Sequence, residues 1–333
     1  MRLFLSSALF STALTAAMLI ALPLPSAAQT APEATPEPTA TAAPADLAPL
    51  TLRATVLDHR VLPEIEVDGL KMVELSGMAF DPTPSILYAL SDRAMLFSLD
   101  FATDSETITA LAPVSGVPLT DGDGTPLSHD VFSPEAVTMR RDGPETGTLL
   151  IVSETGPRAA VFGLDGRMWS EHPLPEILRD PSGQSGANAG LEAMTELPGI
   201  GMLTMPEAPL ADAPALEHRI WRADGTSFFY SSDDIGESRV KSMTATPDGQ
   251  LLMIERTKAK KQLTPHLRLL DPARCTADAA CPTAVVPLDI PGIDDADFEG
   301  LTRVGDGLYL IVSDDKVKKQ QRSVFALIRV ELD

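Results

Sequence analysis

The sequence has few basic residues, only two cysteines and a single long apolar run. Each of these shortages excludes some classes of function. Its 333 residues include 26 Lys and Arg against 47 Asp and Glu, which gives a net charge of −21. A nucleic-acid binder must neutralise phosphates with a basic face, and docking on anionic lipid needs basic clusters, so we expect neither partner. Hydrophobic residues make up 44% of the chain, which is enough to bury a core and excludes disorder of the whole chain.

The long apolar run lies at the N-terminus. Met1 and Arg2 precede an apolar stretch over residues 3–24, and small residues at 26–28 follow it. This order predicts a secretory signal peptide over residues 1–28, cleaved after Ala28. An uncleaved membrane anchor is the alternative, because the stretch is nearly long enough to span a bilayer. We expect a periplasmic or secreted protein that does not insert into the membrane once the signal is removed.

Two regions follow the signal. Residues 29–49 are rich in Pro, Ala and Thr, hold almost nothing that a core would bury, and predict a disordered linker. Residues 50–333 form the expected folded domain, which includes Cys275 and Cys281. In an oxidising compartment so close a pair predicts a disulfide that closes a small surface loop. A metal site at these cysteines would need further ligands, and the usual ligand spacings are absent.

The folded domain contains an internal repeat. Five segments share a small or charged first residue, an apolar stretch, a turn, a second apolar stretch and a final acid, and their starts lie 49 to 59 residues apart. They are residues 76–92, 135–154, 192–207, 241–255 and 299–314. Short apolar runs bounded by Pro, Asp and Gly are typical of antiparallel strands joined by turns.

The repeat predicts an all-β fold, a β-propeller of four-stranded blades. Five units account for the domain, and six blades are the alternative if residues 108–133 or 209–237 hold another unit. The last unit lacks one strand, which residues 51–63 can supply, so we expect pairing of the N- and C-terminal strands to close the ring. Another multi-stranded β fold is the remaining alternative.

A radial repeat brings matched residues together around the axis. The first residues of the five units, called the ring positions, are Ser76, Glu135, Glu192, Lys241 and Glu299. The acids that end the second apolar stretch, called the strand-end acids, are Asp92, Glu154, Glu207, Glu255 and Asp314. Converging carboxylates raise one another's pKa unless a cation lies between them, and Ca²⁺ prefers such oxygen ligands. Ordinary ion pairs and strand caps are the alternative for both sets.

Basic residues follow the strand-end acids, among them Arg93, Arg158 and Lys316. Arg binds phosphate or carboxylate through two parallel hydrogen bonds, and Lys acts as a mobile point charge, so these residues are candidate ligands for an anionic substrate. Local ion pairs at the rim are the alternative. Lys241 departs from the acidic pattern of the ring positions, and an ion pair from Lys241 to an axial Glu would weaken the case for a metal cage.

Several motifs resemble the family described as "esterase-like activity of phytase". They are the Phe-Glu-Gly-Leu run at 298–301, Ser-Asp-Asp at 313–315 with Gln320, and Asn-Ala-Gly-Leu-Glu-Ala-Met at 188–194. The resemblance extends over residues 75–332 and implies an exported propeller-type domain that hydrolyses phosphate and carboxylic esters. The site residues that it carries over are Glu135, Glu192, Glu299, Asp314 and Asp315, with Arg93 and Arg158 beside them.

Three functions are consistent with these residues. The first is a Ca²⁺-dependent phosphomonoesterase on a small-molecule phosphate ester, with Glu135, Glu192, Glu299, Asp314 and Asp315 as metal ligands. In it a Glu of the ring acts as general base and Arg93, Arg158, Lys241 and Lys316 bind the substrate. The second is a Ca²⁺-dependent lactonase or arylesterase at the same carboxylates. The third is a non-catalytic propeller that binds a ligand or protein, and for all three we expect a monomer.

Overall fold

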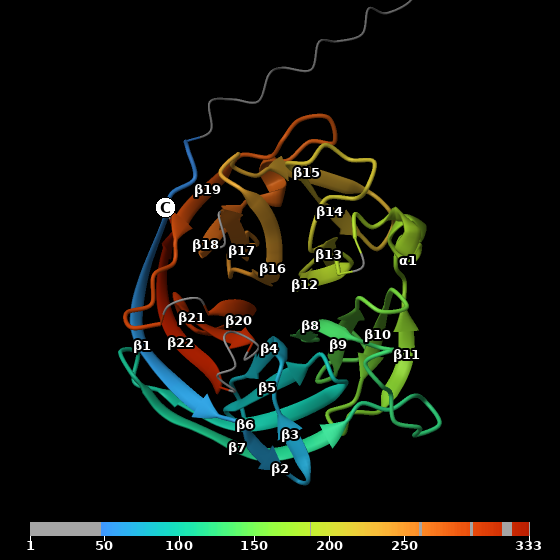
Figure 1. Ribbon diagram of the computed structural model, residues 1–333, viewed down its shortest axis with the longest axis vertical. Coiled ribbons are helices and arrows are strands. Elements are labelled where there is room, and N and C mark those ends of the chain that lie inside the picture. The colour runs from blue at the N-terminus through green and yellow to red at the C-terminus, as the bar shows by residue number, and fades with distance from the viewer. Residues whose placement is uncertain (1–47, 187, 260–261, 294–295, 315–321, 333) are drawn as a thin grey trace, which may run out of the picture. The chain divides into compact units, whose positions relative to one another are not determined.

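The computed structural model describes residues 48–186, 188–259, 262–293, 296–314 and 322–332. Within these ranges, five four-stranded antiparallel sheets follow one another around a ring (Figure 1). The predicted five-bladed propeller is therefore confirmed. The six-bladed alternative is wrong, because residues 108–133 and 209–237 supply outer strands and loops of blades that are already counted.

Four blades are continuous in sequence, and their strands run in order from the axis outward. The first consists of β4 (Leu75–Asp81), β5 (Ile86–Ser91), β6 (Met95–Thr103) and β7 (Ile108–Pro118). The second consists of β8 (Pro134–Met139), β9 (Leu149–Ser153), β10 (Arg158–Phe162) and β11 (Met168–His172). The third consists of β12 (Leu191–Leu197), β13 (Gly201–Pro206), β14 (Glu217–Arg222) and β15 (Ser227–Ser231). The fourth consists of β16 (Glu237–Ala245), β17 (Leu251–Ala259), β18 (Gln262–Leu270) and β19 (Thr283–Pro287).

The fifth blade closes the ring with strands from both ends of the domain. It contains β20 (Asp297–Gly305), β21 (Leu308–Asp314), β22 (Arg322–Leu332) and β1 (Leu52–Pro63). Strand β1 pairs antiparallel with β22, from Leu52 opposite Leu332 to Pro63 opposite Arg322, and Figure 1 shows the two side by side. The predicted closure is confirmed, and it pairs the edge that β22 would otherwise expose.

A few elements lie outside the blades. A small hairpin of β2 (Ile65–Val67) and β3 (Leu70–Met72) precedes the first blade, and a one-turn helix, α1 (Glu176–Arg179), follows the second. Two short 3-10 turns cover Pro181–Gly183 and Pro272–Arg274. In the part of the chain that is described, no helix is long and apolar enough to cross a membrane.

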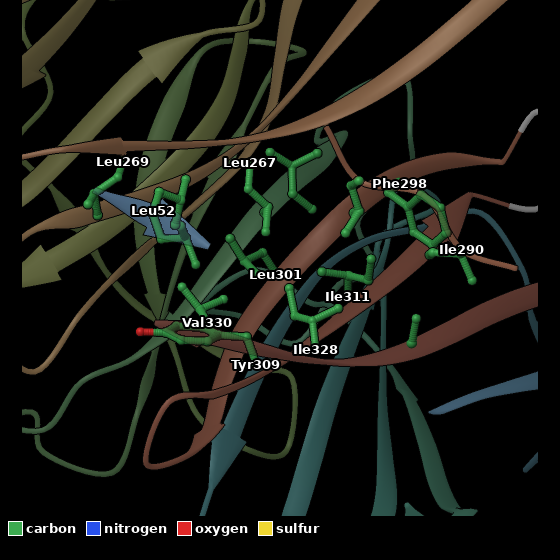
Figure 2. Packing of buried hydrophobic residues seen from close by; sticks show 14 of the residues in the cluster. Leu52, Leu267, Leu269, Ile290, Phe298, Leu301, Tyr309, Ile311, Ile328 and Val330 are labelled. Atoms are coloured by element: carbon green, nitrogen blue, oxygen red, sulfur yellow. The ribbon is translucent and has the colours of Figure 1, made fainter. Parts of the chain in front are cut away.

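The hydrophobic core is divided among the spaces between blades. The cluster in Figure 2 joins the fourth blade to the fifth: Leu267 and Leu269 of β18 pack towards Leu301 of β20 and Ile311 of β21. Leu52 of β1 and Val330 of β22 belong to the same cluster, so the closing pair is held by apolar burial as well as by its hydrogen bonds.

The five inner strands β4, β8, β12, β16 and β20 contact one another in a closed cycle around the axis. Each of them has a β-bulge at its ring position, where one residue is skipped in the pairing with the second strand of the blade. A bulge re-aims a side chain and bends its strand. The same irregularity, repeated five times, is what lets five ring-position side chains lie around one space.

Immediately after each bulge comes a small residue: Gly77, Ala136, Ala193, Ser242 and Gly300. We call this set the waist. A Cβ atom added to Gly77 would lie 3.1 Å from the carbonyl oxygen of Glu135 and 3.2 Å from the backbone nitrogen of Val137. Small side chains therefore let neighbouring inner strands approach each other closely at this level.

We predict that Gly77→Ala destabilises the fold by about 1–3 kcal/mol, because the added methyl group meets the backbone of β8, which cannot move without disturbing the blade. Urea unfolding of the purified protein measures the change. The matched control is Gly122→Ala, where the nearest atom to an added Cβ is 3.8 Å away. Equal midpoints for the two variants would contradict tight packing at the waist.

Candidate functional site

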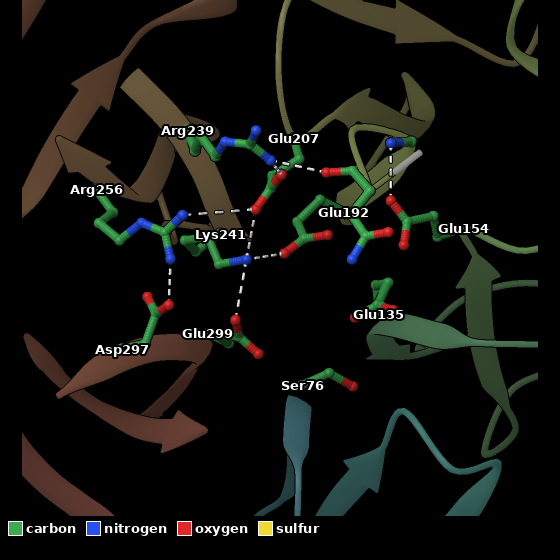
Figure 3. A network of polar contacts seen from close by, with 12 residues as sticks. Ser76, Glu135, Glu154, Glu192, Glu207, Arg239, Lys241, Arg256, Asp297 and Glu299 are labelled. Atoms are coloured by element: carbon green, nitrogen blue, oxygen red, sulfur yellow. Dashed lines mark hydrogen bonds and ion pairs between the residues drawn. The ribbon is translucent and has the colours of Figure 1, made fainter. Parts of the chain in front are cut away.

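The ring positions meet at the start of the five inner strands, where Glu207 of the third blade joins them (Figure 3). We call Glu135, Glu192, Glu207, Lys241 and Glu299 the axial cluster. Glu192, Glu207 and Lys241 are each about 5% exposed, and Glu135 is 9% exposed. Ser76, the remaining ring position, donates its hydroxyl hydrogen to the carbonyl oxygen of Pro134 at 2.7 Å. The ring positions thus converge as the repeat predicts.

Lys241 is the centre of the axial cluster. Its Nζ atom forms ion pairs with the Oε1 atoms of Glu192, of Glu207 at 2.7 Å and of Glu299 at 2.9 Å. Burial works to lower the pKa of Lys241, but the three carboxylates together raise it well above its ordinary value. The ammonium is therefore charged, and it is the cation that these carboxylates share.

Two arginines support this centre from outside. Arg239 forms an ion pair with Glu207 and donates to the backbone oxygen of Asn188 at 2.7 Å. Arg256 forms an ion pair with Asp297 and lies 4.0 Å from Glu207. Asp297 Oδ1 and Arg256 Nε are buried without a hydrogen-bond partner among the described residues. Water or a polar ligand atom can satisfy them there.

Glu135 lies across the axis from this centre, and Figure 3 draws no contact between it and Lys241. Its Oε1 atom accepts a hydrogen bond of 2.9 Å from Ser133 Oγ, which lies 3.0 Å from His129 Nδ1. His129 Nδ1 also lies 3.1 Å from the carbonyl oxygen of Asp92, so its hydrogen can be shared between that carbonyl and the serine hydroxyl. A hydrogen-bonded chain thus leads from the axis through Ser133 to the imidazole.

The pKa of Glu135 is raised well above its usual range. Burial is the main cause, and the negative charges of Glu192 and Glu299 add to it, while Lys241 opposes them. Burial also raises the pKa of Glu192, but there the direct ion pair with Lys241 acts against the rise and favours the ionised form. The axial cluster thus contains a carboxyl group whose neutral form is favoured and carboxylates paired with a cation, a combination that general acid–base chemistry uses.

Glu154 is a strand-end acid at the edge of the same space. Burial raises its pKa, and its Oε1 atom accepts a 2.9 Å hydrogen bond from the backbone nitrogen of Gly190, which acts in the opposite direction. Figure 3 shows this bond on the side of the axis where Glu135 lies. Glu154 is therefore held by the backbone of the third blade.

The described residues of the axial cluster do not fit a divalent cation. Lys241 already bonds to Glu192 and Glu299, which are two of the predicted metal ligands, and the raised pKa of Glu135 favours its neutral form. Among the residues that the structure describes, no group of three or more His, Cys, Asp or Glu side chains is placed to hold a metal ion. Asp315, another predicted ligand, lies outside the described residues, and calcium binding stays a prediction.

The other predicted site residues are Arg93, Arg158, Asp314 and Lys316. Arg93 is half exposed and bonds to Glu74, with a distance of 3.0 Å between its Nη2 and Glu74 Oε1. Arg158 donates to the backbone oxygen of Val131 at 3.0 Å and lies over the ring of Phe132. Asp314, at the end of β21, is 7% exposed. Lys316 lies outside the described residues.

The strand-end acids divide into different roles. Glu207 belongs to the axial cluster, whereas Glu255 accepts hydrogen bonds from Arg268 at 2.6 Å, Ser238 at 2.7 Å and Tyr230 at 3.1 Å. Those three donors occupy both oxygens of Glu255, so this acid stabilises the fourth blade. The ion-pair alternative is therefore the better account of Glu255.

Cys275 and Cys281 form a disulfide, as predicted. It closes the short loop before β19, and the two cysteines also pack against the apolar cluster between the third and fourth blades.

Further functional residues, not predicted from the sequence, stand two positions before the bulges. Ser133, Arg239 and Asp297 each precede a ring position by two residues, and all three contact the axial cluster or its supporting arginines. The matching residue in the first blade, Glu74, bonds to Arg93. The repeat register contained this signal, because side chains two residues apart on a strand point the same way.

Comparison with known proteins identifies the family of the chain. A family model named phytase-like, described as esterase-like activity of phytase, matches residues 71–317. The chain belongs to this family. The match confirms the resemblance found in the sequence. The matched residues include all five ring positions. A search of curated proteins finds no match.

Solved structures resemble the chain at low identity. A member of the duf4221 family from Bacteroides vulgatus is 10% identical, with a TM-score of 0.45, over 85% of this chain and 99% of that one. The PQQ-bound aldose sugar dehydrogenase from Streptomyces coelicolor is 8% identical, with a TM-score of 0.44, over 84% of this phytase-like chain and 99% of its own.

We predict that Lys241→Met destabilises the protein by about 3–5 kcal/mol, because three buried carboxylates lose the one ammonium that they share. Denaturant unfolding at neutral pH measures this loss. Lys71→Met is the matched control: Lys71 pairs with Glu64 at 2.7 Å but is 64% exposed, so its loss should change little. A Lys241→Met protein as stable as the control would show that the ion pairs contribute nothing.

The same variant tests the metal prediction. With the ammonium gone, Glu192, Glu207 and Glu299 present free oxygens to one space, and we expect Ca²⁺ to raise the thermal midpoint of Lys241→Met more than that of the unmodified protein. The comparison uses EDTA-treated samples of both. A larger Ca²⁺ shift in the unmodified protein would instead place the metal at other residues.

Glu135→Gln tests the neutral carboxyl group through pH. A carboxyl whose pKa is raised by folding contributes stability that is complete below the unfolded value near 4.5 and is lost as pH rises towards the folded value. Glutamine has no proton to lose. The free energy of unfolding of the variant should therefore rise relative to that of the unmodified protein by about 1.4 kcal/mol for each pH unit above the unfolded pKa. The control is Glu331→Gln, on an exposed carboxylate. A difference in free energy of unfolding that does not grow with pH would mean that Glu135 is ionised in the folded protein.

Proposed function

We propose that the protein is a hydrolase of phosphate esters, with the axial cluster as its reaction site. The observation that carries the proposal is Glu135, a buried carboxyl group with a raised pKa that lies across the axis from the charged Lys241. A carboxyl group whose neutral form is favoured can give its proton to a leaving group. The family description, esterase-like activity of phytase, supports the same reaction class.

The proposed chemistry assigns a role to each part of the cluster. Lys241, with Arg239 and Arg256 near it, attracts the phosphate and stabilises the charge that builds up on its oxygens. Water attacks phosphorus while the bond from phosphorus to the ester oxygen breaks, and that oxygen takes the proton of Glu135. Glu299, which forms an ion pair with Lys241, accepts the proton of the attacking water. The products are inorganic phosphate and the alcohol, and a final exchange of protons restores both carboxyl groups.

Ser133 and His129 extend this proposal. After each reaction Glu135 must recover a proton, and the chain of hydrogen bonds through Ser133 to His129 offers a route towards the surface. His129 lies at the exposed end of that chain, so it can exchange protons with water. Arg93, Arg158 and Lys316 remain proposed contacts for a larger anionic substrate.

Export is part of the proposal. The Cys275–Cys281 disulfide supports an oxidising compartment, because such bonds are rare in the cytosol. Together with the apolar N-terminal run, it favours a protein that acts in the periplasm or outside the cell.

The activity test uses release of inorganic phosphate from p-nitrophenyl phosphate and from inositol hexakisphosphate. We predict that Glu135→Gln lowers kcat by about 10²- to 10⁴-fold, because the proton donor is lost, while the protein stays folded. Glu331→Gln, which changes an exposed carboxylate on β22, should keep full activity. p-Nitrophenyl acetate run in parallel separates phosphate esters from carboxylic esters, and an EDTA arm tests dependence on a divalent cation.

One observation favours a second function. Glu192, Glu207 and Glu299 all bond to Lys241, so the charges at the centre of the cluster offset one another. A network of ion pairs that only stabilises the fold would have the same arrangement. A non-catalytic propeller that binds a ligand at this face is the function that such a network would serve. Absence of hydrolysis of both kinds of ester by the unmodified protein would favour it over the hydrolase.

A further inference from the structure

A cavity lies on the far side of the waist from the axial cluster. This space, which we call the distal cavity, has a volume of about 980 Å³. It is lined by the later halves of the five inner strands and the turns that follow them: residues 78–80, 82, 137–143, 195–201, 243–249 and 301–305. The ring positions and the waist residues all belong to the described part of the chain, and none of them lines it. The distal cavity is therefore separate from the site proposed above.

Threonine hydroxyl groups surround the axis in the distal cavity. The third residue after each ring position is Ala79, Thr138, Thr195, Thr244 or Thr302, and all five line the cavity. Thr195 is 3% exposed and Thr302 is 7% exposed. No side-chain hydrogen bond involves any of these four threonines within the described ranges of the chain. A hydroxyl group that lines a cavity and has no partner within the protein can both donate and accept hydrogen bonds to a molecule in that cavity.

The charge of the distal cavity differs from that of the whole protein. Its charged lining residues are Arg140, Arg141, Arg303, Asp142, Glu196 and Asp248, three of each sign. Arg140 is also held by ion pairs to Glu145 and, at 3.1 Å, to Glu196. A balanced lining in a chain of net charge −21 favours an uncharged ligand over a polyanion or a polycation.

The remaining wall is apolar. Met78, Val137, Met243 and Leu301 come from four different inner strands and line the cavity beside the threonines. An uncharged ligand that fits must therefore present hydroxyl groups to one set of residues and C–H surfaces to the other. The volume lies within the range of small-molecule binding sites.

We propose that the distal cavity is a binding site for an uncharged polyhydroxylated molecule of the sugar or cyclitol class. Thr195 and Thr302 bind its hydroxyl groups, and the apolar residues contact its C–H faces. This site is independent of the hydrolase proposed for the axial cluster, and it holds whether or not that reaction takes place.

Microcalorimetry of the purified protein with glucose, maltose and myo-inositol as probes tests the site. We expect at least one probe to bind at millimolar concentration. In the double variant Thr195→Val, Thr302→Val, which keeps shape but removes two hydroxyl groups, binding should weaken about tenfold or more. The variant should be about as stable as the unmodified protein, because neither hydroxyl group has a hydrogen-bond partner among the described residues.

Thr55→Val is the matched control, because Thr55 is an exposed strand threonine on β1, far from the inner strands. It should bind the probe as the unmodified protein does. Two results overturn the proposal. Absence of both heat and a rise in thermal midpoint with every probe means that the cavity holds water only. Equal binding by the double valine variant and the unmodified protein places the ligand elsewhere.

Discussion

The close approach of five inner strands at the axis is the constraint on which the rest of the structure depends. Gly77 and Gly300 lie against the neighbouring strand with no room for a larger side chain, and Ala136, Ala193 and Ser242 occupy the matching places. Larger residues can lie near the axis only above or below this level. The waist therefore divides the axis into a charged end at the bulges and a hydroxyl-lined end at the distal cavity.

At the charged end, Lys241 determines what the carboxylates can do. A ring of carboxylates alone would need a metal ion or several protons, whereas one lysine in place of a fifth acid supplies a covalently attached cation. It forms ion pairs with three acids of the axial cluster, Glu192, Glu207 and Glu299. Glu135, on the other side of the axis in Figure 3, lies in a buried place where the neutral form is favoured. The single lysine among the ring positions thus gives three of the four acids of the axial cluster a shared cation.

Much of this could be predicted from the sequence. The repeat predicted the five blades, the closure by the terminal strands and the convergence of Glu135, Glu192, Lys241 and Glu299, because radial symmetry turns register into position. The partners of individual acids could not be predicted in that way. Glu207 and Glu255 occupy the same place in the repeat, yet one bonds to Lys241 and the other to Arg268, since each choice depends on which basic side chain a neighbouring strand supplies. The small hairpin of β2 and β3 also follows no rule of the repeat.

Closure of the ring has a consequence for the order of folding. Leu52 pairs with Leu332, so the fifth blade joins the first strand of the domain to the last one synthesised. Contacts between residues so distant in sequence form slowly, because the intervening chain must first be brought together. Four blades can assemble from local hairpins as the chain lengthens, but the fifth must wait for the C-terminal strand. The ring is therefore complete only when β22, the last strand of the domain, has paired with β1.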